Sequence, residues 1–202
     1  MINDDELLLY YYREVDAAVA VHELVDERPR HVEIQLLADV AVQIHSIEAP
    51  DGFRQYRRYR GFRGVPTWAT NPKRWERALE IADAADPMAA ERGFIHRDHH
   101  PGNVLWSRGR VSGVVDWIEA CVGPLAVDAA HCRWNLLRVG RGDLVTQYAR
   151  CEGVVIDPLW DVVNSIDLIV DGMLPGPDAE AVEAFLFAAL AVAFLGAGRF
   201  SV

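Results

Sequence analysis

The sequence predicts a mainly helical domain that carries one small β-hairpin insertion. Most of the chain consists of apolar stretches with helical spacing that end at Gly, Pro or Asp. Near the middle, two β-rich runs, 104–106 and 111–115, flank the short turn Ser107-Arg108-Gly109-Arg110. With 202 residues, of which 51% are hydrophobic, the chain can bury a full hydrophobic core. One domain, with at most a small appendage, is therefore expected.

Helices are expected on both sides of the hairpin. Residues 4–27 begin with acids and contain no Gly or Pro, and residues 32–47 place an apolar residue at every fourth position. A further helix begins after Asn71, which is placed as a cap, with Pro72 at the first helical position. The remaining predicted helices cover residues 127–138, 144–151, 158–170 and 178–195.

Charge and composition exclude several kinds of partner. The net charge of -10 argues against nucleic acid and anionic membranes, and it suits a cationic substrate. The arginine-aromatic run 53–63 is therefore interpreted as a solvated surface segment. No secretory leader is recognised at the amino terminus, and the apolar stretch 184–198 is too short to cross a bilayer. Three widely spaced cysteines predict neither a disulfide framework nor a zinc ribbon, and a reducing cytoplasm is the expected location.

Three oxygen-bearing side chains are expected to converge around the hairpin. Asn103 stands just before the outgoing strand and Asp116 just after the returning one, so both lie at the same end. Asp98 precedes Asn103 by one short loop. Carboxylate and amide oxygens suit a hard cation such as Mg²⁺. The spacing His96-Arg97-Asp98 and then Asn103 also matches the kinase catalytic-loop pattern, in which the Asp accepts a hydroxyl proton and the Asn holds Mg²⁺.

At this point the sequence resembles the aminoglycoside phosphotransferase and choline kinase-like family, which has a protein kinase-like fold. The resemblance rests on HRDHHPGNVL, then VVDW after the hairpin, then GPLAVDAA, and it extends loosely over residues 32–195. It implies transfer of a phosphoryl group from ATP, with Mg²⁺, to a hydroxyl of a small molecule. Aminoglycoside, macrolide, choline-like amino alcohol and sugar all remain open as acceptors, and GTP remains open as donor.

The resemblance also implies a role for individual residues. Asp98 would be the catalytic base or orienting carboxylate, and Asn103 and Asp116 would hold Mg²⁺. His96 and Asp128 would support the catalytic loop through packing and hydrogen bonds. One departure is Arg97, where small-molecule phosphotransferases more often have Gly. No Ala-Pro-Glu element follows Asp116, which disfavours a protein substrate.

Two other readings of the same residues are weaker. A metal-dependent hydrolase could use His96, Asp98, His99 and His100, but the adjacent His99 and His100 project in different directions. The pair His131-Cys132 could suggest a nucleophile and its base, but neighbours on a helix diverge by about 100°, so a packed helix face is expected.

The sequence shows no recognisable signal for the kinase lobe that binds the nucleotide phosphates. There is no Gly-x-Gly-x-x-Gly motif, and Lys73, the single lysine, stands at a predicted helix start rather than in a strand. The sequence therefore predicts a carboxy-terminal kinase-like lobe at 32–202, preceded by a helical segment at 1–31, without the β-rich amino-terminal lobe. Two hypotheses follow: a truncated phosphotransferase with impaired activity, or an inactive remnant that acts as a binding module. The oligomeric state is not predicted.

Overall fold

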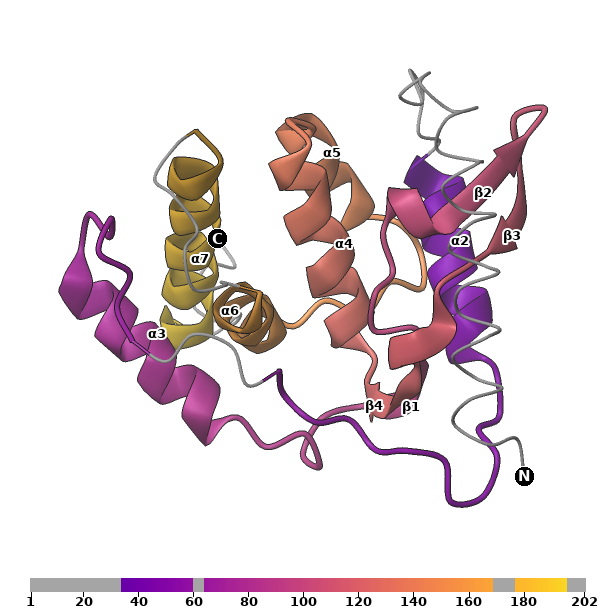
Figure 1. Cartoon of the computed structure of the whole chain (residues 1–202), viewed down its shortest axis with the longest axis horizontal. Coiled ribbons are helices and arrows are strands. Elements are labelled where there is room, and N and C mark those ends of the chain that lie inside the picture. The colour runs from indigo at the N-terminus through magenta and orange to yellow at the C-terminus, as the bar shows by residue number, and fades with distance from the viewer. Residues whose placement is uncertain (1–33, 60–63, 169–176, 196–202) are drawn as a thin grey trace, which may run out of the picture. The chain divides into compact units, whose positions relative to one another are not determined.

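A computed structural model of the chain describes residues 34–59, 64–168 and 177–195, and everything below concerns these residues (Figure 1). The predicted helix at 4–27 and the predicted amino-terminal segment 1–31 lie outside the described residues. The assignment of residues 32–202 to a kinase-like lobe stays a prediction.

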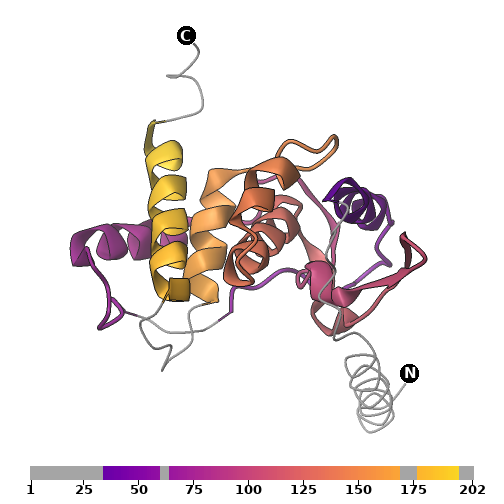
Figure 2. The ribbon, with the colours of Figure 1, turned by 90° about the horizontal axis from the view of Figure 1, so that it is seen from above.

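The described part of the chain is rich in helices, as the sequence predicts. Helix α6 packs against α3, α4 and α7, and α4 also contacts α5 (Figures 1 and 2). Helix α2 contacts α5 and the first strand. The helices span α2 Ile34–His45, α3 Pro72–Ala84, α4 Ala126–Arg138, α5 Gly142–Tyr148, α6 Pro158–Asp167 and α7 Pro177–Leu195.

Two of these helices, α3 and α6, begin with the same kind of side-chain N-cap. The Asn71 side chain accepts a hydrogen bond from the backbone N of Arg74, and Asp157 does the same for Leu159. A proline follows each cap, where its missing N–H costs no helical hydrogen bond. The predicted cap at Asn71 is thus confirmed. It also fixes Lys73 on a helix, and its side chain is exposed.

The hydrophobic core is centred on α6, in which residues 160–167 are all buried. Trp160 packs edge-on against Tyr56, and the fully buried Trp75 of α3 contacts Phe187 of α7. Apolar side chains of this size contribute about 1.5–3 kcal/mol each when fully buried. The core therefore holds α3, α4, α6 and α7 together, and α4 is the helix that carries Asp128 toward the loop between β1 and β2.

The predicted hairpin is present, but the prediction of a single β insertion is wrong. Strands β2 Val104–Ser107 and β3 Arg110–Val114 pair antiparallel, with a register shift at Leu105/Trp106. A second antiparallel sheet joins β1 Arg92–Ile95 to β4 Cys121–Pro124. Each of these strands has four residues and contains a glycine, so neither shows an alternating pattern that sequence reasoning could use.

The second sheet depends on a close approach of Tyr56. Gly123 of β4 pairs with Gly93 of β1, and a Cβ added at Gly123 would lie 2.6 Å from the Cβ of Tyr56. The backbone N of Tyr56 also donates to the carbonyl of Val122 at 2.8 Å. Glycine at 123 therefore lets the segment before α3 pass directly over β4. This arrangement holds β1, which leads into the loop that contains Asp98.

None of the described helices is long and apolar enough to cross a membrane. Cys121, Cys132 and Cys151 are all free thiols, the first two buried and the third partly exposed.

Candidate active site

The loop between β1 and β2 is anchored by the buried carboxylate of Asp128, which lies in the first turn of α4. Its Oδ2 accepts a hydrogen bond from the backbone N of His96 at 3.0 Å, and its Oδ1 accepts one from the backbone N of Arg97 at 2.6 Å. His45 Nε2 of α2 donates to Oδ2 at 3.1 Å. Burial acts to raise the pKa of Asp128, but these hydrogen bonds and the neighbouring histidines prevail and lower it. This geometry fits the predicted supporting role of Asp128.

Two buried histidines fix the loop to its neighbours. His96 Nε2 lies 2.9 Å from the carbonyl oxygen of Val115, the residue before Asp116. His99 Nε2 lies 3.2 Å from the carbonyl oxygen of Leu37 in α2. Since a carbonyl oxygen only accepts, both Nε2 atoms carry the hydrogen. His96 thus ties the loop to the residue before Asp116, and His99 ties it to α2. The supporting role of His96 stays a prediction.

Arg97 has the positive backbone φ of 70°, which explains why glycine suits this position. Its side chain is buried, forms an ion pair with Glu119 at 3.1 Å and donates to the carbonyl of Arg57. The guanidinium also lies 3.9 Å from the ring centroid of Tyr59 and 4.9 Å from that of Tyr56. These contacts offset a backbone strain of about 1–2 kcal/mol. Arg97 thus has a structural role, because its side chain attaches the loop to Glu119 and to the segment that contains Tyr56 and Tyr59.

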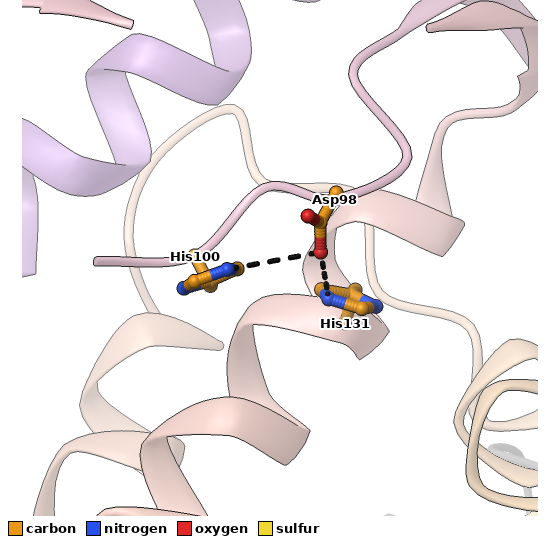
Figure 3. Close-up of side chains that lie close together, drawn as sticks. All are labelled: Asp98, His100 and His131. Atoms are coloured by element: carbon orange, nitrogen blue, oxygen red, sulfur yellow. Dashed lines mark ion pairs between the residues drawn. The ribbon is translucent and has the colours of Figure 1, made fainter. Parts of the chain in front are cut away.

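Asp98 is held through both of its carboxylate oxygens. Asn103 Nδ2 donates to Asp98 Oδ2 at 2.9 Å and to the Asp98 backbone carbonyl at 2.8 Å. On the other side, His131 Nε2 of α4 lies 2.7 Å from Asp98 Oδ1 (Figure 3). The prediction that Asp98 and Asn103 lie together is confirmed. The Asp98 side chain keeps 30% of its surface exposed.

The surroundings keep Asp98 ionised at neutral pH. Burial acts to raise the pKa of Asp98, but hydrogen bonds from His131 and Asn103 and the nearby His100 outweigh it, so the pKa is lowered. An ionised carboxylate offers only acceptor sites, so Asp98 can accept a hydrogen bond from a hydroxyl group.

Asp116 reaches the site by a different route. The backbone N of Val115 donates to the carbonyl of Asn103 at 3.0 Å, so the hairpin brings Asp116 next to Asn103 as predicted. Asp116 has left-handed backbone angles, φ 61° and ψ 59°, and its side chain is exposed. Within the described ranges, no hydrogen bond or ion pair involves its carboxylate, which leaves both oxygens available.

The residues fit a hard divalent cation. Because Asn103 Nδ2 is bound to Asp98, its Oδ1 faces the other way as an unused acceptor, and the Asp116 carboxylate is also unused. An amide oxygen, a carboxylate and water or phosphate oxygens form the ligand set that Mg²⁺ prefers.

The histidine cluster expected for a hydrolase does not form, because His96 and His99 bind backbone carbonyls on different sides. Instead Asp98, His100 and His131 lie within 4.8 Å of one another (Figure 3). His100 Nδ1 accepts from the backbone N of Gly102 at 3.0 Å, so its Nε2 carries the hydrogen and is no metal donor. His131 Nε2 likewise gives its hydrogen to Asp98. This tautomer pattern disfavours a zinc site.

Comparison with known proteins identifies the family of this chain. The model of the phosphotransferase enzyme family matches residues 3–166, further toward the amino terminus than the segment 32–195 that the motifs cover. The chain belongs to this phosphotransferase family. The resemblance predicted from the central motifs is therefore confirmed.

Several homoserine kinases are similar to this phosphotransferase over shorter stretches. The protein of Gluconobacter oxydans is 45% identical over 58 residues, which are 28% of this chain and 18% of that kinase. The protein of Methylocella silvestris is 43% identical over 54 residues, 27% of this chain and 17% of that kinase. That of Rhizobium johnstonii is 33% identical over 86 residues, 41% of this chain and 27% of that kinase. The matches thus span about a quarter or less of each relative, and they support phosphoryl transfer of the kinase type.

Sequence reasoning missed two histidines of the candidate site, His45, which contacts Asp128, and His131, which contacts Asp98. His45 is remote in sequence and offers no local signal. His131 does, because it stands three residues after Asp128 on the same helix and must face the same side. The expectation of a packed helix face holds only in part: His131 is buried, but it contacts Asp98.

Proposed function

We propose that this phosphotransferase transfers the γ-phosphoryl group of ATP to a hydroxyl of a small, amino-bearing molecule. The observation that carries the proposal is the pair Asp98 and Asn103, joined at 2.9 Å beside the exposed carboxylate of Asp116. One carboxylate faces the acceptor, and two oxygen-bearing side chains are left for the metal. This is the arrangement that phosphoryl transfer requires, since its catalysis is mostly positioning and charge stabilisation.

In the proposed reaction, Asp98 accepts a hydrogen bond from the acceptor hydroxyl and turns its oxygen toward the γ-phosphorus. A new O–P bond forms, the bond from the γ-phosphorus to the bridging oxygen breaks, and ADP leaves. The hydroxyl proton passes to the Asp98 carboxylate. Asn103 Oδ1 and the Asp116 carboxylate would hold Mg²⁺, which when bound neutralises charge on the nucleotide phosphates.

The acceptor class follows from two separate supports. The net charge of -10 favours a cationic or amino-bearing substrate, and the similar proteins are named homoserine kinases. Homoserine is therefore the first acceptor to assay, followed by choline and an aminoglycoside. We also propose that turnover by the 202-residue chain alone is slow, because the sequence offers no glycine-rich loop or strand lysine for the nucleotide.

The test incubates the purified chain with [γ-³²P]ATP, Mg²⁺ and each acceptor, and identifies phosphorylated products by mass spectrometry. We expect slow transfer to an amino alcohol that EDTA abolishes and that Asp98→Asn lowers by a factor of about 10² or more. Equal product with wild type and Asp98→Asn would overturn the phosphotransferase proposal and leave the binding module. Rapid, Asp98-dependent turnover would instead overturn the proposed impairment.

A further inference from the structure

The catalytic carboxylate is clamped from two directions, by its own loop and by helix α4. Asn103 holds Asp98 Oδ2 at 2.9 Å, and His131 holds Oδ1 at 2.7 Å. The His131 side chain is only 6% exposed, so its ring is enclosed by protein at this contact. Figure 3 shows its ring edge directed at the carboxylate from below the loop.

The direction of this hydrogen bond is fixed. Asp98 is ionised and only accepts, so His131 Nε2 is the donor and Nδ1 carries the lone pair. His131 Nδ1 is buried and has no hydrogen-bond partner in the described part of the chain. Burying a ring nitrogen without a partner costs free energy, and a leucine would fill the same space without that cost. Packing alone therefore does not account for a histidine here.

Each clamp controls a different motion of the carboxylate. Asn103 lies five residues along the same loop and moves with it, so by itself it leaves the plane of the carboxylate free to turn about Oδ2. His131 belongs to a largely buried helix, in which Ala130, Cys132 and Trp134 are also buried. The contact through Oδ1 therefore fixes the position of Asp98 relative to the buried helix α4.

We propose that His131 is a positioning residue for phosphoryl transfer. By donating to Oδ1, it fixes the plane of the Asp98 carboxylate so that a remaining lone pair is directed at the acceptor hydroxyl. This inference rests on the proposed function. Misplacing a reacting group by about 1 Å can cost a factor of 10² in rate.

Two substitutions separate positioning from packing. His131→Leu keeps the apolar bulk and removes the donor, and His131→Gln places an amide N–H close to the position of Nε2. With Mg-ATP as donor and L-homoserine or water as acceptor, we expect His131→Leu to lower kcat about 10- to 100-fold with the KM for ATP unchanged. His131→Gln should recover most of that loss. Asn135→Ala, one turn further along α4, is the control and should keep the wild-type kcat.

A kcat of His131→Leu equal to wild type would overturn the inference, as would a Gln variant no better than the Leu variant at equal thermal stability. Asp98→Asn separates the two proposals: if it leaves transfer unchanged, the proposed function fails and the positioning role with it. If Asp98→Asn is inactive while His131→Leu keeps the wild-type kcat, only the positioning role fails.

A second measurement does not depend on turnover. In ¹⁵N-histidine-labelled protein, NMR should show His131 protonated at Nε2, with a resonance that shifts in Asp98→Asn. A His131 resonance that is identical in both proteins would show that the contact is absent and overturn the inference.

Discussion

Replacing Asp128 tests how the catalytic loop is held. In Asp128→Asn, the amide oxygen can accept from only one of the two backbone N–H groups, those of His96 and Arg97, and the amide nitrogen then faces the other donor. Asp128 is fully buried, so water cannot take the place of the lost acceptor. A hydrogen bond to a charged group contributes about 1.5–3 kcal/mol, and an orphaned buried N–H costs about 1–3 kcal/mol. We expect a loss of about 3 kcal/mol.

The loss is measured by thermal unfolding followed by circular dichroism. For a chain of this length, about 3 kcal/mol lowers the Tm by about 6–12 °C. Asp128→Ala should lose at least as much, because it leaves both backbone donors unpaired. The matched control is Asp143→Asn, which changes an exposed acid paired with Arg141 and should leave the Tm unchanged. A Tm for Asp128→Asn equal to that of wild type would refute the anchoring argument.

Three further predictions concern stability. Burial lowers the pKa of His99 to about 4, so the unfolded chain binds a proton below about pH 6.5 and the folded chain only below about pH 4. Through this window His99 should therefore contribute a fall in stability of about 3 kcal/mol. Urea unfolding of His99→Gln should lose this contribution and keep that of His100, whose pKa burial also lowers to about 4. Arg97→Ala keeps the strained φ and loses the side-chain contacts, so in urea it should be about 1 kcal/mol less stable than Arg97→Gly. Gly123→Ala should cost about 1–3 kcal/mol by overpacking against Tyr56, whereas Gly113→Ala, with 3.7 Å to its nearest atom, should be close to neutral in the same assay.

Each of these has a contradicting result. A pH slope in His99→Gln as steep as in wild type would assign the slope to other groups. Equal stability of the alanine and glycine variants at position 97 would mean that the backbone there is not strained. A Gly123→Ala protein as stable as Gly113→Ala would show that the segment at Tyr56 moves aside without lowering the free energy of unfolding.

Helices and the hairpin could be predicted because their signals are local. The cap and proline at Asn71 and Pro72, the helical spacing before Arg138 and the turn at Gly109 each act within a few residues. The sheet between β1 and β4 could not be predicted, because it pairs Arg92 with Pro124, and the Asp98 loop and the hairpin lie between these residues in the sequence. Strands this short become stable only through packing that sequence periodicity does not record.

The candidate site also has a part that could be predicted from the sequence and a part that could not. Asp98, Asn103 and Asp116 could be located because one loop and one hairpin bring them together, a geometry that follows from spacing. The contact of His131 with Asp98 depends on how α4 docks against the loop, and that docking is fixed by Asp128 and by the core. The sequence motif thus locates the candidate groups, and tertiary packing determines how firmly they are held.

The most direct test of the central claim is the rate of phosphoryl transfer from [γ-³²P]ATP, measured in a single turnover with Mg²⁺, for three site variants. Asp98→Asn, Asn103→Leu and Asp116→Asn should each lower the rate by a factor of about 10² or more, and Asp143→Asn should keep the wild-type rate. Excess Mg²⁺ should partly restore Asp116→Asn and leave Asp98→Asn unchanged, because only the former acts on the metal. Wild-type rates in all three site variants would contradict the claim that these oxygen-bearing side chains form the phosphotransferase site.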